Sequence, residues 1–459
     1  MVSRSRSVLS PIASFLTGGA RAVPDERRAL ALAFLCNFVL LGSYYILRPV
    51  RDTVATVFGV DSLQLLFTGT FVGTLIASPI YSIIATRVTL RRLLPGMFWF
   101  WLLNVLLFQV LFSIAPQSRP LAAAYYIWFS VANLFMVSVF WTLMVDLFSA
   151  AQATRLFAII AAGGSLGAIA GPVITRFTVH SAGLGGLLFM AAGGFLVVIV
   201  LVHLLMHEKD RLRASGAPVQ HSRLDHRLGD NPFQGFRELF ASAYSRQQAL
   251  FVLLMTWVNT VAYFLQTEVV ARSVSGIAGR VVAIADIALV VNIGSAAVLI
   301  LGVGRFVQRF GVTAGLVLNP IIMLVAYVCI ALSPTLLTLQ ALQITRQISQ
   351  FAIARPSREI CFTVVAQDSR YRTKNIIDTL VYRFGDLSAA WIEAGLRSVG
   401  LRVLGAAATG FGFCVLWGAG ALVLGRRYEI ARRRAQAAVP RPPEDSPGPD
   451  AVVPGGRRL

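Results

Sequence analysis

The sequence predicts an all-α membrane protein whose twelve transmembrane helices form two bundles of six. The chain of 459 residues is 56% hydrophobic and only 14% charged, with a mean hydropathy of +0.70. Apolar runs of about 20 residues, each long enough to cross a hydrocarbon core as a helix, recur twelve times along it. One long polar stretch, 207–246, separates the first six runs from the last six.

The hydropathy pattern places each span in order. The first half is expected to cross the membrane at 29–56, 63–85, 94–115, 121–145, 156–179 and 184–206. The second half is expected to cross it at 247–270, 281–306, 312–332, 335–354, 375–397 and 403–425. The predicted regions are therefore a cytoplasmic N-tail (1–28), an N-terminal bundle (29–206), a cytoplasmic central loop (207–246), a C-terminal bundle (247–425) and a disordered basic C-tail (426–459).

Positive charge indicates the orientation of these spans. The formal net charge is +20, and most of the 41 lysines and arginines lie in tails and loops on one side of the predicted topology. Basic loops remain in the cytoplasm, so we expect both termini and the central loop there. Arginine strongly outnumbers lysine, as in GC-rich bacterial genomes, so we expect a bacterial inner membrane. The dispersed basic residues form no nucleic-acid-binding motif. We therefore expect membrane lipid, and no nucleic acid, as a partner.

The sequence contains no pattern for a metal, a cofactor or a catalytic centre. The four cysteines and five histidines show no metal-ligand spacing. The glycine-rich run in 156–179 lacks the Gly-Lys-Ser/Thr ending of a nucleotide-hydrolysing loop. We therefore expect no cofactor and no enzyme activity, and any transport has to be secondary.

A weak internal repeat supports two equivalent halves. Thr154-Arg155 opens the fifth span and Thr373-Lys374 opens the eleventh, while basic loops at 87–92 and 305–309 occupy similar positions in the two halves. Two homologous six-helix halves are typical of the major facilitator architecture, in which the solute site lies between the halves near the membrane midplane.

The end of the first span, YYILRPVRD (residues 44–52), places charge where the chain is otherwise apolar. Arg48, Arg51 and Asp52 share one helix face at i, i+3 and i+4. Pro49 predicts a break or bend beside Arg48, so that a new helix N-terminus and two guanidinium groups favour an anion. Alternatively, both arginines reach an interface or pair with acids to hold helices together.

A second charged cluster occupies the eleventh span. Lys374, Asp378, Tyr382 and Asp386 follow each other at intervals of four, with Arg383 beside them, so one helix face is expected to line a cavity opposite the first span. The alternative is structural, with Asp378 pairing Lys374 and Asp386 pairing Arg383 to lock helices.

Three further intramembrane polar residues are candidates. Asn133 in the fourth span either binds solute or bonds a neighbouring helix. Glu268 and Asp286 are candidates for proton coupling, or else partners of Arg272, Arg280 or the central arginines.

Glycines in the fifth span predict close helix packing. Gly163, Gly167 and Gly171 recur every fourth residue and leave one face nearly bare of side chains.

Three motifs resemble the ATP/ADP antiporter (nucleotide translocase) family of plastids and obligate intracellular bacteria, and most closely its free-living bacterial relatives. They are YYILRPVRDT, TRLFAIIAAGGSLGAIAGP and FTVVAQDSRYRTKNIIDTLVYRFGD, within the twelve-span core. The resemblance implies that Arg51 and Lys374 meet substrate phosphates, one from each half. Family exchangers carry lysine at the Arg51 position and glutamates inside spans four and seven, where this chain has Asn133 and only the more outward Glu268.

These observations predict a monomeric secondary transporter of an anionic solute, with ATP/ADP-type nucleotide exchange as the first candidate. Arg48, Arg51 and Lys374 would bind the anion, and Tyr44, Tyr45 or Tyr382 would stack on a base or simply pack. The alternatives are proton symport of another organic or phosphorylated anion, and a non-transporting sensor or assembly protein. Unpaired central cations favour a carrier, whereas pairing of every cation with an acid favours the sensor.

Overall fold

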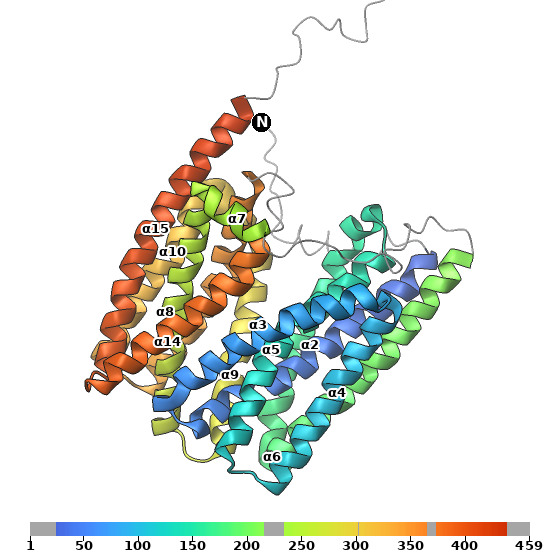
Figure 1. Ribbon diagram of the computed structural model, residues 1–459, viewed down its shortest axis with the longest axis horizontal. Helices are drawn as coiled ribbons and strands as arrows, with labels where there is room; N and C mark the ends of the chain where they lie inside the picture. The colour runs from blue at the N-terminus through green and yellow to red at the C-terminus, as the bar shows by residue number, and fades with distance from the viewer. Residues whose placement is uncertain (1–23, 215–233, 302, 365–372, 438–459) are drawn as a thin grey trace, which may run out of the picture.

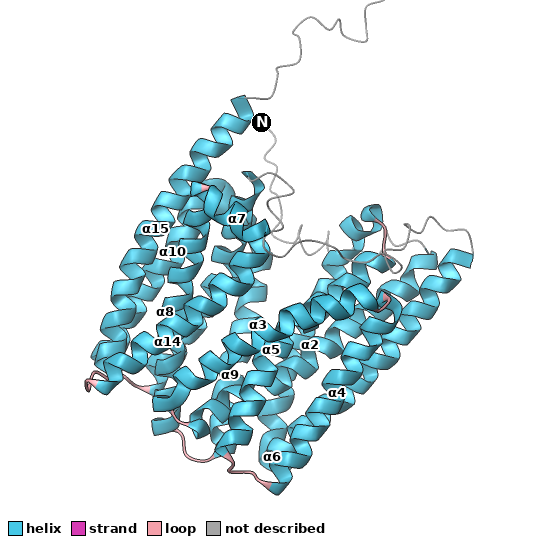
Figure 2. Ribbon diagram, in the orientation of Figure 1, coloured by secondary structure: helices cyan, strands magenta, loops and turns pink. Residues whose placement is uncertain are grey.

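The computed structural model describes residues 24–214, 234–301, 303–364 and 373–437. Every regular element in these ranges is helical (Figure 2). The first half contains α2 (Pro24–Phe58), η1 (Val60–Ser62), α3 (Leu63–Arg87), α4 (Leu90–Ile114), α5 (Arg119–Leu147) and α6 (Ala150–Ala214). The second half contains α7 (Gln234–Ala241), α8 (Ala243–Ser273), α9 (Ile277–Leu301), α10 (Val303–Leu332), α11 (Leu336–Ser349), η3 (Gln350–Ala354), α12 (Arg355–Cys361), η4 (Phe362–Val364), η5 (Ile377–Val381), α14 (Tyr382–Ser398) and α15 (Val403–Ala437).

Helix α6 supplies two membrane crossings. Its 65 residues are interrupted at Gly183, whose φ of 62° is accessible to glycine at little cost. Near the start of α6, Arg155 pairs with Glu26 of α2, and near its end Glu208 pairs with Arg28 of the same helix. Both ends of α6 therefore lie beside the start of α2, so the helix reverses at Gly183 and forms the predicted fifth and sixth spans.

Nine helices among the described residues are long and apolar enough to cross a membrane, and α6 is one of them. The predicted tenth and eleventh spans fall outside this set because π-helical turns divide them, η3 between α11 and α12, and η5 before α14. The observed helices extend past the predicted apolar runs, since their polar ends also form helical hydrogen bonds. The all-α membrane fold is therefore confirmed.

Two predicted boundaries need correction. Residues 426–437 continue α15 as a helix, so the prediction of disorder from 426 is wrong for them; Leu424 and Tyr428 bury against the bundle and hold this segment in place. The central stretch 207–246 contains the end of α6, the short helix α7 and the start of α8. The rest of the predicted central loop and both outer tails lie outside the described residues.

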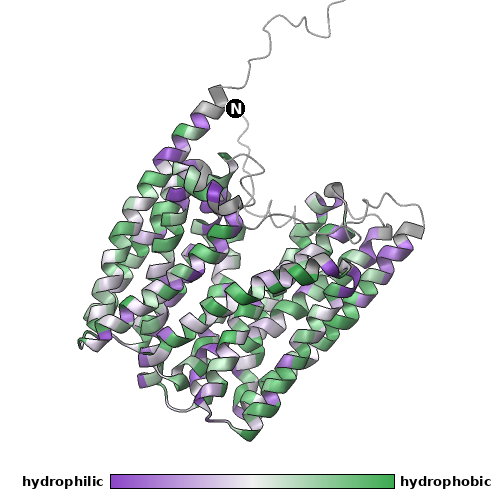
Figure 3. Ribbon diagram, viewed as in Figure 1, coloured by the Kyte–Doolittle hydropathy of each residue, from purple (hydrophilic) through white to green (hydrophobic). Residues whose placement is uncertain are grey.

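Each half has its own apolar core. One buried cluster joins α2, α4, α5 and α6, and a second joins α8, α10, α11 and α15. Large apolar side chains such as Phe177 and Ile114, each 74% exposed, lie on outer surfaces, as lipid contact requires. Figure 3 shows hydrophobic residues along much of the helix length and hydrophilic ones gathered near the upper helix ends.

The glycine face of α6 packs against α2 as predicted. A Cβ placed on Gly167 would lie 2.1 Å from the Phe38 backbone oxygen, and one on Gly163 would lie 2.4 Å from that of Phe34. Both distances are far below van der Waals contact, so the two backbones approach more closely than any larger residue permits.

The two halves join at one end of the molecule. Pro24 and Ala437 lie at the same end, called here the tail end, where the halves diverge in Figure 1. The opposite end, called the closed end, carries η1 and the turns after α8 and α14. A small apolar cluster there, including Phe67 of α3, Phe264 of α8 and Ala390 of α14, spans both halves. Among the described residues, each hydrogen bond and ion pair given between the halves involves the middle or the closed end; examples are Trp391 with Thr68 and Arg280 with Thr56.

Candidate functional site

Two arginines from opposite halves meet near the centre of the molecule. Arg48 of α2 donates to the Gln347 side-chain oxygen of α11 at 3.2 Å, and Arg346 is the next residue along α11. The positive charge of Arg48 acts electrostatically on Arg346. Within the described ranges, no carboxylate oxygen lies within 4.0 Å of either guanidinium group. These are therefore central cations without an acidic partner in this part of the chain.

Neutral amides surround Arg346. Its Nη1 donates to Asn259 at 2.7 Å and to Gln350 at 3.2 Å, and its Nη2 and Nε donate to Gln343 at 2.8 and 3.0 Å. Gln343 is itself fixed by donating to the Ala262 carbonyl at 2.8 Å. The amides orient the guanidinium group without neutralising its charge.

The backbone of α11 changes pitch directly after Arg346. Helix α11 ends at Ser349 and continues into the π-helical turn η3. Such turns are frequent at functional sites because they rotate the side chains that follow.

On the other half, α2 is one continuous helix through Pro49, so the break predicted beside Arg48 does not occur. A proline removes a single helix hydrogen bond, and the close contacts of α2 with α6 hold the helix together.

Aromatic rings pack beside the central cations. Arg48 lies over the Tyr45 ring at 5.6 Å, and Tyr44 stacks on Phe129 with ring centroids 5.4 Å apart. Tyr44 and Tyr45 contact each other edge to face. The predicted tyrosines are therefore beside Arg48, with flat surfaces close to the charge.

Arg51 already has an acidic partner. Its Nη2 and Nε lie 2.5 and 2.9 Å from the Asp52 carboxylate, and its guanidinium carbon is 5.1 Å from the Tyr126 ring centroid. The Tyr263 hydroxyl of the other half also donates to Asp52 at 3.2 Å. Arg51 therefore pairs with an acid, which is the structural alternative predicted for the two arginines of α2.

A second pair links α14 to the first half. Arg383 contacts Asp386 at 3.2 Å, as the structural alternative predicted, and its Nη2 also donates to the Ser130 carbonyl of α5 at 3.2 Å. Thr260 donates to the other Asp386 oxygen at 3.0 Å. Tyr382 lies beside Arg383, with the guanidinium carbon 6.0 Å from its ring centroid.

Lys374 lies near the tail end in a different set of pairs from that predicted. It donates to Glu359 at 2.5 Å, while Asp378 pairs with Arg358 at 3.0 Å, so the predicted Lys374–Asp378 pair is wrong. The reason is the π-helical turn η5 (Ile377–Val381), which inserts extra backbone between these residues and rotates the expected i, i+4 face.

The remaining predicted residues occupy several places. Asn133 is half-buried on α5. Glu268 of α8 pairs with Arg272 and Arg397 at 2.5 Å each at the closed end. Asp286 of α9 forms an ion pair with Arg176 of α6, across the halves. None of these three joins Arg48 and Arg346.

One residue of the central site, Arg346, was not predicted as a site residue. Arg346 stood in the amide-rich run QITRQISQ, and a charge flanked by glutamines inside a span was the signal that could have identified it.

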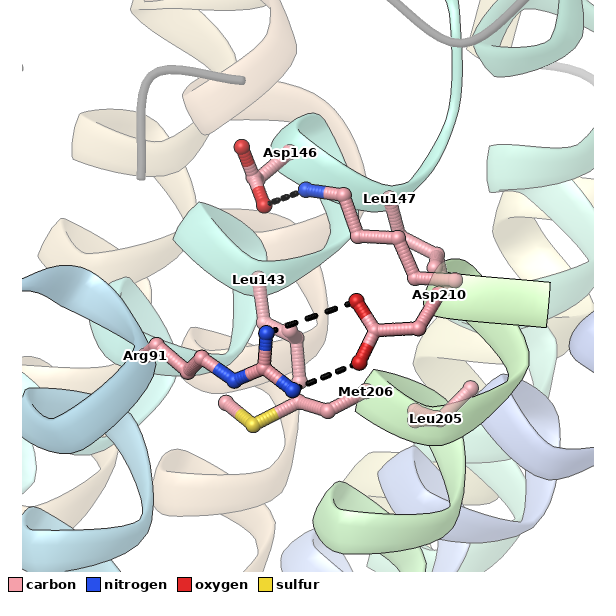
Figure 4. Close-up of a pocket in the computed structure, with 8 residues that line it drawn as sticks. Arg91, Leu143, Asp146, Leu147, Leu205, Met206 and Asp210 are labelled. Atoms are coloured by element: carbon pink, nitrogen blue, oxygen red, sulfur yellow. Dashed lines mark hydrogen bonds and ion pairs between the residues drawn. The ribbon is translucent and has the colours of Figure 1, made fainter. Parts of the chain in front are cut away.

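A small pocket at the tail end of the first half is separate from the central arginines. Figure 4 shows Arg91 joined to Asp210 beside Asp146, Leu143, Leu147, Leu205 and Met206. Lys209, which also lines the pocket, forms an ion pair with Asp146. These ion pairs connect α4, α5 and α6. Because its cations already contact carboxylates and the space is small, the pocket is a helix-joining site and not a solute site.

Comparison with known proteins agrees with this architecture. The sequence profile of the Major Facilitator Superfamily matches residues 33–353. No curated protein matches the sequence significantly. A bacterial homologue of the human lysosomal transporter Spinster, in an inward-facing and unoccupied conformation, aligns with a TM-score of 0.56 and 16% identity over 90% of this chain and 98% of its own. The nucleoside transporter NupG aligns with a TM-score of 0.59 and 13% identity over 90% of this chain and 100% of its own.

A POT family transporter in complex with a thioalcohol-conjugated peptide has the same fold, with a TM-score of 0.57 and 12% identity over 89% of this chain and 96% of its own. These low identities establish the fold alone, whereas the profile match covers most of the chain. The chain therefore belongs to the Major Facilitator Superfamily, as a multi-pass membrane transporter and not an enzyme.

Proposed function

We propose that this protein is a secondary transporter of an anionic solute, which binds between Arg48 and Arg346. The observation that carries the proposal is that Arg48 of one half bonds Gln347, the neighbour of Arg346 on the other half, and that its charge acts on Arg346, with amides in place of acids around Arg346. A solute held by both halves is well placed to be carried as they rock against each other.

Energetics support an anion at this position. A charged side chain in the membrane interior costs about 2.5 to 3.5 kcal/mol on insertion scales, and two like charges add their mutual repulsion. Arg51, Arg383 and Lys374 offset this cost with carboxylates, but Arg48 and Arg346 have only neutral partners among the described residues. A bound anion relieves both charges at once. The same observation favours a carrier over a non-transporting sensor, in which every cation would be paired.

A nucleotide is the first candidate solute, with ATP/ADP exchange as the mode. The resemblance to nucleotide translocases supports it, and so do Tyr44 and Tyr45, whose rings lie beside Arg48 and offer a base a stacking surface. A nucleotide carries more negative charge than two arginines balance. Binding would therefore draw on Arg51 or Lys374, each of which would first leave its carboxylate.

A smaller dianion moved by proton symport is the second candidate. It is favoured by the ion pairs of Arg51 with Asp52 and of Lys374 with Glu359, which leave just two central positive charges without acids in the described chain. Two charges match a dicarboxylate or a small phosphorylated anion.

Orientation and assembly complete the proposal. We place the protein in a bacterial inner membrane as a monomer, with both termini in the cytoplasm, on the basis of its basic tails and loops. The closed end then faces the periplasm and the tail end faces the cytoplasm.

A ligand-dependent thermal-shift screen tests the site. Purified protein is heated with ADP, pyrophosphate, succinate or uridine, the last being a neutral control. Stabilisation by at least one anion, lost in Arg48→Gln and Arg346→Gln but kept in Arg119→Gln, supports the site; Arg119 is an exposed arginine at the closed end. Equal stabilisation of wild type and both central variants would remove the assignment.

A further inference from the structure

Glu393 is a buried carboxylate without a hydrogen-bond donor. It lies on α14 near the closed end with 0% exposure, and neither of its oxygens receives a hydrogen bond from any described residue. Its nearest charge is Arg397 on the next turn, whose Nε lies 3.4 Å away without hydrogen-bond geometry. A buried ionised carboxylate normally accepts several hydrogen bonds, so Glu393 lacks what its charged form requires.

The surrounding charges do not balance Glu393. Arg397 is shared with Glu268 of α8 at 2.5 Å and with Asp61 of η1 at 3.7 Å. Arg272 of α8 also contacts Glu268, at 2.5 Å. The side chains of Glu268, Glu393 and Arg397 are at most 5% exposed, whereas those of Asp61 and Arg272 are 71% and 56% exposed and reach solvent. With both buried acids ionised, two buried carboxylates face one buried guanidinium group, and one negative charge remains in excess.

Two further arginines lie at the closed end, and neither forms an ion pair with Glu393: Arg280 of α9 donates to Thr56 and to the Val274 and Ala271 carbonyls, and Arg402 after α14 is exposed. Tyr327 of α10 acts electrostatically on Glu393, but its hydroxyl donates to the Val258 carbonyl at 2.7 Å. The charged residues of α3 and of α15 within their described ranges lie toward the tail end, at Arg87 and from Arg426 onward.

We infer that Glu393 is a proton-binding site that couples proton uptake to closure of the closed end. One proton on Glu393 leaves the buried members of the cluster neutral, because Glu268 then matches Arg397. The pair between Arg397 and Asp61 joins the second half to the first, so the cluster lies directly at the contact between the halves. Loss of the proton leaves the excess charge, which is relieved when the halves separate and water reaches Glu393.

The sign of the coupling follows from these two states. Closing the end removes water from Glu393 and favours its protonated form, so closure takes up a proton and opening releases one. Acid therefore favours the closed arrangement and alkali favours opening, with a limit of about tenfold per pH unit for a single proton. We assign the positive charge that balances Glu393 to a proton. The described residues contain no group of three or more His, Cys, Asp and Glu side chains that could hold a metal ion in its place. The inference does not depend on the identity of the solute.

Distance measurement between spin labels tests the inference without transport. Labels are placed on Ile114→Cys of α4 and Val399→Cys after α14, which are 74% and 71% exposed and belong to opposite halves at the closed end. Cys329, the exposed native cysteine, is changed to serine, and the three buried cysteines remain. Distances are recorded in nanodiscs without solute in mildly acidic and mildly alkaline buffer, each in potassium and in sodium salt.

The expected result is a population of longer distances that grows severalfold to tenfold per pH unit on going to alkali, equally in both salts. Glu393→Gln, which keeps the shape of the protonated acid, should hold the short distance at both pH values. The control Arg119→Gln changes an exposed closed-end charge and should keep the pH response. The inference is overturned if wild type shows no pH response or if Glu393→Gln keeps it. A response seen only in sodium also overturns it.

Discussion

Replacing Arg346 by glutamine shows whether this residue binds the solute or only stabilises the fold. The guanidinium group donates to Asn259, Gln343 and Gln350, all neutral, so no acid is left behind when the charge is removed. Glutamine retains an amide that can bond the same neighbours. We therefore expect the solute-free melting temperature to stay the same or to rise, because a buried charge with only neutral partners in the described chain disappears.

The affinity for the anion should change much more than the stability. A hydrogen bond to a charged group contributes about 1.5 to 3 kcal/mol, and each 1.4 kcal/mol corresponds to a factor of ten in the dissociation constant. Loss of one such contact predicts binding weaker by about 10- to 150-fold. Arg48→Gln should show a similar loss, and the double variant should lose less than the sum of the two if both residues hold one anion.

Isothermal titration gives the dissociation constants. ADP and pyrophosphate are each titrated into wild type, Arg48→Gln, Arg346→Gln and the double variant. Pyrophosphate lacks a base, so a loss shared by both ligands locates the contact at the phosphates. Arg346 is not a solute ligand if Arg346→Gln binds ADP and pyrophosphate as tightly as wild type. The same conclusion follows if the variant is strongly destabilised while its affinity for both is unchanged.

Three further changes test particular contacts. Asp52→Asn removes the acid from a buried ion pair and should cost about 3 to 5 kcal/mol of stability in chemical denaturation; a cost below about 1 kcal/mol would mean that the pair is not maintained. Gly167→Val should prevent close packing, because its Cβ would lie 2.1 Å from the Phe38 oxygen, and a melting temperature equal to that of wild type would contradict that packing. Glu359→Gln frees Lys374 and should tighten ADP binding more than succinate binding in titrations; equal effects on both would argue against a role for Lys374 at the phosphates.

Hydropathy and small residues predicted the scaffold well. Apolar runs report directly on lipid exposure, so the nine long apolar helices among the described residues, of which α6 covers two crossings, fall on predicted spans. The glycines of α6 predicted its close packing because a helix face without side chains lets a neighbouring backbone approach closely in a membrane. Gly183 marks the reversal between two spans that the hydropathy had already separated.

The candidate site was only partly predictable. Arg48 was identified because a charge in an apolar span is costly, but its neighbour Arg346 depends on the meeting of α2 and α11, which spacing within one segment does not encode. The predicted pairing of Lys374 with Asp378 in the eleventh span was wrong because a π-helical turn changes the helical register there. No pattern in the residues predicted that turn. Glu393 was missed for a similar reason, since its lack of hydrogen-bond donors is a property of the folded protein.

Counterflow in proteoliposomes shows whether the transported anion crosses between Arg48 and Arg346. Vesicles loaded with ADP are offered labelled ATP, with and without an imposed proton gradient, and with wild type, Arg119→Gln or the double variant Arg48→Gln/Arg346→Gln. Our account predicts uptake by wild type and Arg119→Gln that requires internal nucleotide, and loss of uptake in the double variant although it remains folded in the membrane. Uptake by empty vesicles driven by the gradient would replace exchange with symport. Undiminished uptake by the double variant would contradict the claim that the anion crosses between Arg48 and Arg346.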